Sequence, residues 1–177
     1  GQKWMDMSEG HYGVSLLNDC KYGHSALDGV MTLTLIKSGI EPNPTADQEE
    51  HTFTYALYPH AEGWRQANTV QEAMKLNQPL LSEEGGHAGC QNSFVWVDKS
   101  NVIIETVKMA EDNDGIIVRL YESENAKTKA HIFFGEKISS VESCNCLEEI
   151  EQTIETDGEG FEITVKPYEI QTYRVRF

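Results

Sequence analysis

The sequence predicts an all-β fold, a β-sandwich or barrel with one short helix. Short runs of alternating apolar and polar residues recur along the 177 residues, and this alternation is the period of a half-buried strand. Turn dipeptides such as Asp28-Gly29, Asp114-Gly115 and Asp157-Gly158 separate these runs. Only one segment changes to a helical period. Many short strands with turn signals between them are typical of a sandwich or barrel.

The N-terminal half is expected to contain three strands, a long loop and the helix. Residues 38–50 are rich in Gly, Pro and acidic residues and are predicted to be a loop, whereas residues 3–8 are too mixed to predict a strand. Pro59 is expected to end the third strand. The three strands are expected at residues 11–17, 30–36 and 51–58.

The helix is expected at Gln66–Asn77, where apolar residues recur at spacings of three and four. Asn68 or Thr69 is predicted to cap its N-terminus, with Glu72 reaching back toward Thr69 in a capping box. Pro79 is expected to end the helix. Residues 80–92 are rich in glycine and are therefore predicted to be a loop.

The C-terminal half is expected to be strands throughout. In the hairpin turn Asp112–Gly115, Asp-Gly is expected to supply the positive φ of a primed turn. The same acidic run suits a calcium loop in composition, but an EF-hand needs flanking helices, so a turn is favoured. Residues 1–146 are expected to form the main sandwich, and residues 147–177 can form a separate small β-unit. The strands are expected at residues 93–97, 102–110, 116–122, 129–134, 138–145, 151–155, 160–165 and 169–177.

Composition limits the partners. The chain has 14 Lys and Arg against 29 Asp and Glu, a formal net charge of −15, which repels phosphate backbones and anionic lipids. We therefore expect no nucleic-acid and no membrane partner; a neutral substrate such as a sugar is compatible. No apolar run is long enough to span a bilayer and no leader segment is visible. Because the chain does not begin with Met, we expect it to be a piece of a longer protein.

The cysteines and histidines predict neither a disulfide framework nor a metal site. Four cysteines in a chain of this length are too sparse for a disulfide scaffold, and Cys144 and Cys146 lack the second pair that a zinc site needs. Reduced thiols and a cytoplasmic location are expected. His60 and Glu62 are the only close His–carboxylate pair and are expected to serve a strand end. No nucleophile elbow, dinucleotide fingerprint or phosphate loop is present, so no catalytic residue is predicted.

One polar loop is a candidate binding site. The strand that ends near residue 17 runs directly into Asn18, Asp19, Lys21 and Tyr22. A rigid strand holding hydrogen-bonding and charged side chains at its end can contact a sugar. The alternative is an ordinary hairpin turn with polar residues, and the loop alone does not decide between them.

Several stretches taken together resemble the C-terminal β-domain of the glycoside hydrolase family 38 α-mannosidases, closest to the cytosolic, vacuolar and bacterial branch. They occur in family order over nearly the whole chain. They are residues 13–23 (GVSLLNDCKYG), 46–47 (AD), 51–60 (HTFTYALYPH), 64–65 (WR), 76–80 (LNQPL), 101–108 (NVIIETVK), 114–122 (DGIIVRLYE) and 166–170 (KPYEI).

The resemblance implies a supersandwich of the galactose-mutarotase type and a role in a retaining α-mannosidase. In that family an Asp nucleophile and a zinc ion lie in an N-terminal α/β domain, which this sequence does not include, and the family's His-x-Asp ligand pair occurs nowhere here. We therefore expect no hydrolysis and no bound zinc from this chain alone. The expected partner is the catalytic α/β domain of the same parent chain, through which the chain meets the mannoside.

The resemblance also places the loop at residues 18–23 near the active-site rim. In the Golgi and lysosomal branch the loop usually reads Asp-Arg where this chain has Asp19-Cys20, so the contacts of that Arg cannot be transferred to Cys20. Lys21 can supply a donor instead, Asp19 can orient it or bind a hydroxyl, and Tyr22 can stack on a sugar ring. These roles are hypotheses.

Two alternatives remain open. A stand-alone carbohydrate-binding module would present a row of exposed aromatic residues on one sheet face, and Tyr55, Trp64, Trp96 and Tyr121 are the candidates, although core packing is favoured for most of them. A structural interaction domain would instead expose an apolar patch with no polar loop beside it.

Overall fold

The computed structural model describes residues 1–82, 84–85 and 93–177. These residues form two compact units, Gly1–Gly85 and Gly86–Phe177. In the described part of the chain, no helix is long and apolar enough to cross a membrane. The end of the loop expected at residues 80–92, including Cys90, lies outside the described residues.

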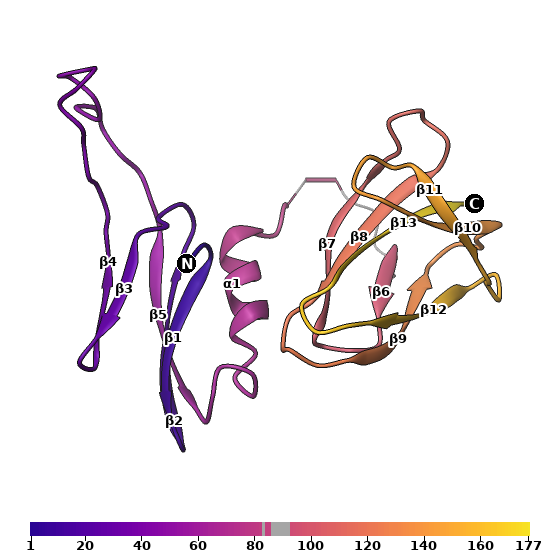
Figure 1. The fold of residues 1–177 in the computed structure, drawn as a ribbon, viewed down its shortest axis with the longest axis horizontal. Helices are drawn as coiled ribbons and strands as arrows, with labels where there is room; N and C mark the ends of the chain where they lie inside the picture. Colours follow the sequence, from indigo (N-terminus) through magenta and orange to yellow (C-terminus); the bar gives the residue numbers. More distant parts are fainter. Residues whose placement is uncertain (83, 86–92) are drawn as a thin grey trace. The chain divides into compact units, whose positions relative to one another are not determined.

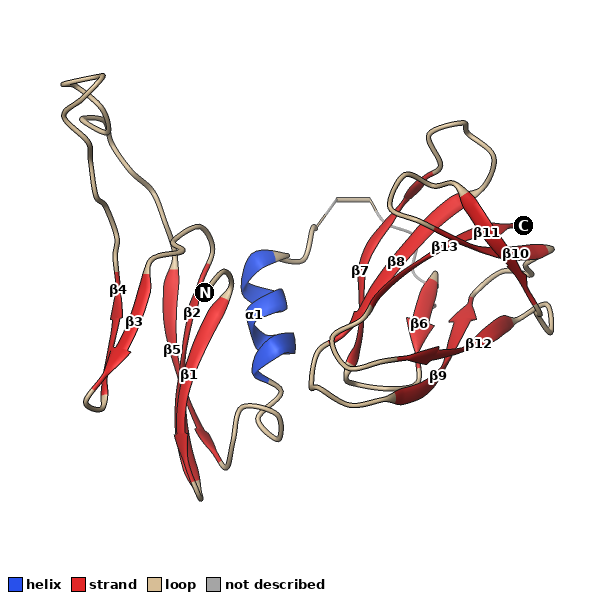
Figure 2. Ribbon diagram, viewed as in Figure 1, coloured by secondary structure: helices blue, strands red, loops and turns tan. Residues whose placement is uncertain are grey.

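The first unit is a three-stranded antiparallel sheet with one helix (Figures 1 and 2). Its strands β1 (Trp4–Glu9), β2 (Tyr12–Asn18) and β5 (Tyr55–Ala61) lie in the order β1-β2-β5. Helix α1 (Thr69–Asn77) packs against β1 and β2. The strands β3 (His24–Leu27) and β4 (Val30–Leu33) pair separately as a hairpin.

Buried polar residues join the sheet to the helix. The Ser15 hydroxyl lies 2.8 Å from the Thr69 hydroxyl and donates to the Asp6 carboxylate at 2.7 Å. His60 Nε2 lies 2.7 Å from the same Asp6 oxygen. Because a buried polar group without a partner is costly, this cluster fixes the position of α1 on the sheet.

The second unit is a sandwich of two antiparallel sheets (Figure 2). One sheet has the order β11-β10-β13-β8-β7 and the other has the order β12-β9-β6. Their facing side chains, among them Leu120, Ile132, Val141 and Phe161, form the core. The strands are β6 (Val95–Val97), β7 (Val102–Met109), β8 (Ile116–Glu122), β9 (Thr128–Phe134), β10 (Ser140–Cys144), β11 (Ile150–Ile154), β12 (Gly160–Val165) and β13 (Ile170–Arg176).

The structure confirms the all-β class and the sandwich, and it corrects three local expectations. Strands β1 and β3 were not predicted. Strand β5 continues through Pro59. Proline lacks a backbone N–H, and an edge strand tolerates this loss because only one of its two sides is paired with another strand. The predicted capping box is wrong: Asn68 is left-handed at the N-cap with no side-chain cap bond, and the Thr69 hydroxyl contacts Ser15 instead.

The division between the two units does not coincide with the boundary expected at residues 146–147. That position falls inside the second unit, between β10 and β11, which pair with each other. The residues after 147 also supply β12 to one sheet and β13 to the other. Turn signals show where a chain reverses, but they do not show which strands will share a sheet.

Candidate functional site

The predicted polar loop follows β2 in the first unit, and Asn18 is its internal support. The Asn18 side chain is fully buried. Its Nδ2 donates to the Gln2 carbonyl at 3.0 Å, and its Oδ1 accepts from the Lys21 N–H at 2.7 Å. Asn77 Nδ2 donates to the Asn18 carbonyl at 3.0 Å. Asn18 therefore holds the loop in shape and is not available to a ligand.

Asp19 joins the loop to the segment before β5. Its Oδ2 accepts from the Thr54 N–H at 2.9 Å, while the Asp19 N–H donates to the Thr54 carbonyl at 3.1 Å. The neighbouring Cys20 side chain and the Thr54 N–H lower the pKa of Asp19, so the carboxylate is ionised at neutral pH. Its Oδ1 has no hydrogen-bond partner among the described residues. This oxygen is itself buried, so Asp19, like Asn18, shapes the loop from within.

Lys21 and Tyr22 carry the remaining chemistry of the loop. The Lys21 ammonium lies 4.6 Å from the centroid of the Phe53 ring, a cation–π contact that positions it without neutralising its charge. Tyr22 is 62% exposed. Lys21 and Tyr22 therefore offer a charged donor and an aromatic face, while Asn18 and Asp19 are structural. This loop can bind a polyhydroxylated ligand.

Ser15, His60 and Asp6 have the composition of a hydrolytic triad, but their arrangement is not catalytic. In a triad the histidine uses one nitrogen for the serine and the other for the carboxylate. Here Ser15 Oγ and the Asp6 carboxylate both approach Nε2, at 3.3 and 2.7 Å. His60 Nδ1 faces the Glu62 carbonyl at 3.1 Å. Since Ser15 is fully buried as well, the cluster is structural.

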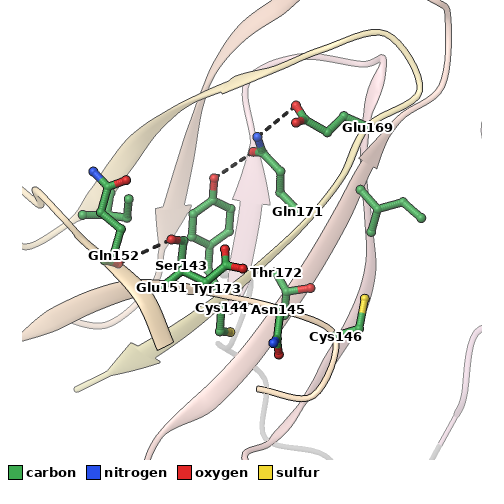
Figure 3. Close-up of a pocket in the computed structure, with 12 residues that line it drawn as sticks. Ser143, Cys144, Asn145, Cys146, Glu151, Gln152, Glu169, Gln171, Thr172 and Tyr173 are labelled. Carbon is green, nitrogen blue, oxygen red and sulfur yellow. Dashed lines mark hydrogen bonds between the residues drawn. The ribbon is translucent and has the colours of Figure 1, made fainter. Parts of the chain in front are cut away.

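The second unit has a polar groove of about 430 Å³ between β10, β11 and β13 (Figure 3). Three side chains form a ladder along the groove: Gln171 and Tyr173 of β13, and Glu169 just before it. The Tyr173 hydroxyl donates to Gln171 Oε1 at 2.7 Å, and Gln171 Nε2 donates to Glu169 Oε2 at 3.1 Å. Nearby, the Ser143 hydroxyl donates to the Gln152 carbonyl at 3.4 Å. The groove can form hydrogen bonds with a ligand.

The groove has no activated nucleophile. Burial raises the pKa of the Cys144 thiol, and burial together with Glu169 raises the pKa of Tyr173, so both groups are protonated at neutral pH. No sequence motif predicted this groove. The spacing of Glu169, Gln171 and Tyr173, two residues apart, is the signal that would have placed them on one face of a strand.

The acidic hairpin after β7 is paired with arginines, which supports the turn prediction over a calcium loop. Asp112 accepts from Arg174 at 2.6 Å and Asp114 from Arg176 at 2.9 Å. The turn is longer than predicted, with positive φ at Asn113 and Gly115. Across the described residues, no group of three or more His, Cys, Asp or Glu is placed to hold a metal ion.

The aromatic residues that could form a sugar-binding row do not share one face. Tyr55 lies on β5 in the first unit and Trp96 on β6 in the second. Trp64 packs against Trp4 with ring centroids 5.2 Å apart, and Tyr121 is partly buried on β8. The four candidates therefore do not form the expected row.

Two family descriptions match the chain. The description "Glycosyl hydrolases family 38 C-terminal domain" matches residues 1–45, which include the polar loop. The description "Glycosyl hydrolases family 38 C-terminal beta sandwich domain" matches residues 101–173, which cover most of the second unit.

Longer proteins contain a related segment. The chain is 35% identical over 182 residues to "Alpha-mannosidase G" of Dictyostelium discoideum, covering 98% of this chain and 17% of that protein. It is 35% identical over 151 residues to human "Alpha-mannosidase 2C1", covering 82% of this chain and 14% of that protein. A solved structure described as an alpha-mannosidase from Enterococcus faecalis V583 has a TM-score of 0.74 at 21% identity, over 98% of this chain and 20% of that one. The chain thus spans under a fifth of the length of these curated relatives.

Proposed function

Because this chain belongs to the C-terminal β-region of glycosyl hydrolase family 38, we propose that it is the non-catalytic part of a retaining α-mannosidase. In this role it braces a catalytic domain and lends it one loop. The observation that carries the proposal is the loop after β2, where Asn18 and Asp19 support the loop from within and Lys21 and Tyr22 keep groups for a ligand. The loop lies inside the stretch that matches the family description.

The rest of the parent chain is the proposed partner. The relatives are several times longer than this chain, which leaves room for a catalytic α/β domain. On β5, the last strand in the order β1-β2-β5, Tyr55 and Leu57 alternate with residues that face α1, and Leu57 is 67% exposed. An apolar sheet face of this kind supports packing against another part of a larger protein. We assign it to the parent's own polypeptide.

The chemistry of the reaction is proposed to reside in that partner. Retention of configuration requires a carboxylate nucleophile and an acid/base residue in one cleft, and the family uses a zinc ion to bind the sugar hydroxyls. The zinc ion and the nucleophile are therefore assigned to the catalytic domain.

A cytoplasmic location is also part of the proposal. Cys20 and Cys146 are exposed and unpaired, and Cys144 is buried and unpaired. Exposed thiols persist where the cell keeps them reduced. Mass spectrometry of the protein after alkylation in intact cells would show Cys20 and Cys146 labelled as free thiols.

The test uses the longer protein that carries this segment. Lys21→Ala removes the charged donor, and Asp19→Asn removes the charge while retaining an oxygen for the Thr54 N–H. Lys21→Ala is expected to lower kcat/KM on an aryl α-mannoside by about tenfold or more, the effect of losing a hydrogen bond to a charged group. Asp19→Asn is expected to lower it as well, because Asp19 shapes the loop that carries Lys21. Lys37→Ala, an exposed lysine in the same unit, is the matched control.

Two results would count against the proposal. Unchanged kinetics in both loop variants would remove the role of the loop. Failure of the longer protein to hydrolyse any α-mannoside would remove the activity itself. A stand-alone carbohydrate-binding module is the second candidate, and the rings that cluster around Trp96 in the second unit give it one specific point of support.

A further inference from the structure

Three rings stack on the outer face of the sheet β12-β9-β6. The Trp96 and Phe133 rings are nearly parallel, with centroids 5.4 Å apart. His131 is two residues before Phe133 on β9, and the centroids of their rings are 4.3 Å apart. Ala130, Ile132 and Phe134 alternate with them and enter the core. The row therefore faces away from the core, and Trp96 is 42% exposed.

A glycine keeps this row uncovered on the β12 side. Gly160 pairs with Phe133 across the two strands. A Cβ atom at Gly160 would clash with the Ile132 carbonyl oxygen and would lie 2.5 Å from His131 Nε2. The absence of a side chain thus lets the strands approach and leaves space for the imidazole ring.

A hollow of about 390 Å³ adjoins the row. His131, Gly160 and Glu162 belong to its lining, together with Glu155 and Asp157. Asp157 receives the N–H groups of Glu159 and Gly160, which lower its pKa and keep it ionised. His131 Nε2 has no hydrogen-bond partner among the described residues and lies 3.9 Å from the Asp157 carboxylate.

The chemistry of this surface selects the class of ligand. A pyranose ring presents a face of C–H groups that packs on an aromatic ring and a rim of hydroxyl groups that donate to carboxylates. The lining has the carboxylates of Glu155, Asp157 and Glu162, and of these Glu162 is paired with Lys129 at 2.8 Å, so the remaining negative charge repels phosphate and other anions. A neutral polyhydroxylated ligand therefore fits both the rings and the charge.

We propose that Trp96, Phe133, His131 and the adjoining hollow form a second carbohydrate-binding surface, separate in sequence from the loop at residues 18–22. Its ligand is an α-mannose oligosaccharide, and this identity rests on the proposed function. The surface acts on binding and not on bond cleavage, since it contains no paired nucleophile and base. A longer oligosaccharide can occupy it more fully than a single mannose unit can, so its effect depends on substrate length.

Binding is tested first on the 177-residue chain with α-linked mannotriose as the probe. Trp96 is the only tryptophan of the second unit, because the other two are Trp4 and Trp64, so its fluorescence reports on this surface. In the Trp4→Phe/Trp64→Phe variant, the fluorescence is expected to change as mannotriose is added and to reach a plateau when the surface is saturated. In titrations followed by NMR, Trp96→Ala is expected to raise the Kd for mannotriose by about threefold to tenfold. Trp96→Phe is expected to recover part of the lost affinity.

The matched control is Tyr55→Ala, an exposed aromatic residue on a sheet of the other unit, which is expected to leave mannotriose binding unchanged. Glu155→Gln with Glu162→Gln provides a second perturbation that does not touch the ring stack, and it is expected to weaken binding as well. Choline is the cationic probe. Binding of choline in place of mannotriose, or mannotriose binding that Trp96→Ala and the double Gln variant both leave unchanged, would overturn the proposal.

Kinetics in the longer protein separate this inference from the proposed function. Trp96→Ala is expected to raise KM for a mannose oligosaccharide about threefold to tenfold and to leave kcat/KM on an aryl α-mannoside unchanged. If both substrates are cleaved and KM does not change, the second surface is refuted while the proposed function stands. If neither substrate is cleaved, the proposed function fails, and the binding experiment still decides on the surface.

Discussion

His60 Nε2 lies 2.7 Å from an Asp6 carboxylate oxygen, in a site where the two side chains are only 3% and 4% exposed. Each ring nitrogen of His60 faces an oxygen acceptor, since Nδ1 lies 3.1 Å from the Glu62 carbonyl. Ser15 donates to the same Asp6 oxygen. One carboxylate thus holds together strands β1, β2 and β5 beneath the helix.

The first prediction concerns this carboxylate. Asp6→Ala leaves His60 and Ser15 without their acceptor in a buried site, so the free energy of unfolding is expected to fall by about 3–5 kcal/mol. Ser8→Ala, which removes an exposed hydroxyl bonded to the same carboxylate, is the control and is expected to cost about 1 kcal/mol or less. Urea unfolding monitored at Trp4 and Trp64 measures both, and equal losses in the two variants would contradict the role of Asp6.

The second prediction is a dependence on acid pH. Arg174 and Arg176 lower the pKa values of Asp112 and Asp114 below their ordinary 3.8. The unfolded chain therefore takes up protons first, and the stability from these carboxylates is present above pH 3.8 and lost as the pH falls further. Asp112→Asn with Asp114→Asn is expected to flatten the decline of unfolding free energy between pH 4 and about pH 2.

The control for this experiment replaces two other exposed carboxylates of the second unit, Glu136→Gln and Glu159→Gln. Unfolding by urea at a series of pH values gives the slope for each protein. Equal slopes for the wild type and the Asp112/Asp114 variant would show that the arginine pairs do not contribute.

The third prediction concerns Glu122, a buried carboxylate that connects three segments. It accepts from Asn101 Nδ2 at 2.8 Å, from the Glu124 N–H at 2.8 Å and from the Tyr168 N–H at 3.0 Å. Burial alone would raise the pKa of Glu122, but these hydrogen bonds together lower it. In Glu122→Gln the new side-chain NH₂ group faces N–H donors and cannot accept hydrogen bonds from them. The free energy of unfolding is therefore expected to fall by about 2–3 kcal/mol.

Glu105→Gln, on the exposed side of β7, is the control for Glu122 and is expected to change stability by about 0.5 kcal/mol or less. Chemical denaturation followed at Trp96 reports on the second unit. A loss in Glu122→Gln no larger than in Glu105→Gln would contradict the account of the three hydrogen bonds.

Sequence periodicity was most informative where side chains simply alternate between core and solvent. The strands at Ile116–Glu122 and Gly160–Val165 have the predicted bounds. In contrast, β1 (Trp4–Glu9) was missed because Asp6 points toward the helix in the position of a core residue. Its buried charge breaks the alternation, and its partner His60 is 54 residues away. No local pattern can reveal such a pair.

The candidate site was predictable in its place but not in the roles of its residues. A strand running into Asn18 and Asp19 correctly indicated a shaped polar loop. The sequence could not show that Asn18 is fully buried and structural, because the partners Gln2 and Asn77 are remote in sequence. The row of Trp96, Phe133 and His131 was hidden for the same reason, since cross-strand register brings Trp96 to Phe133.

Strand β13 is the last strand of the described chain, yet it lies in the middle of its sheet, between β10 and β8. The ribosome must therefore synthesise the chain through residue 176 before β13 can pair with β10 on one side and with β8 on the other. A premature stop codon between Cys144 and Ile170 would leave β10 and β8 with two facing rows of unsatisfied backbone groups, and such a truncated product would be prone to aggregate.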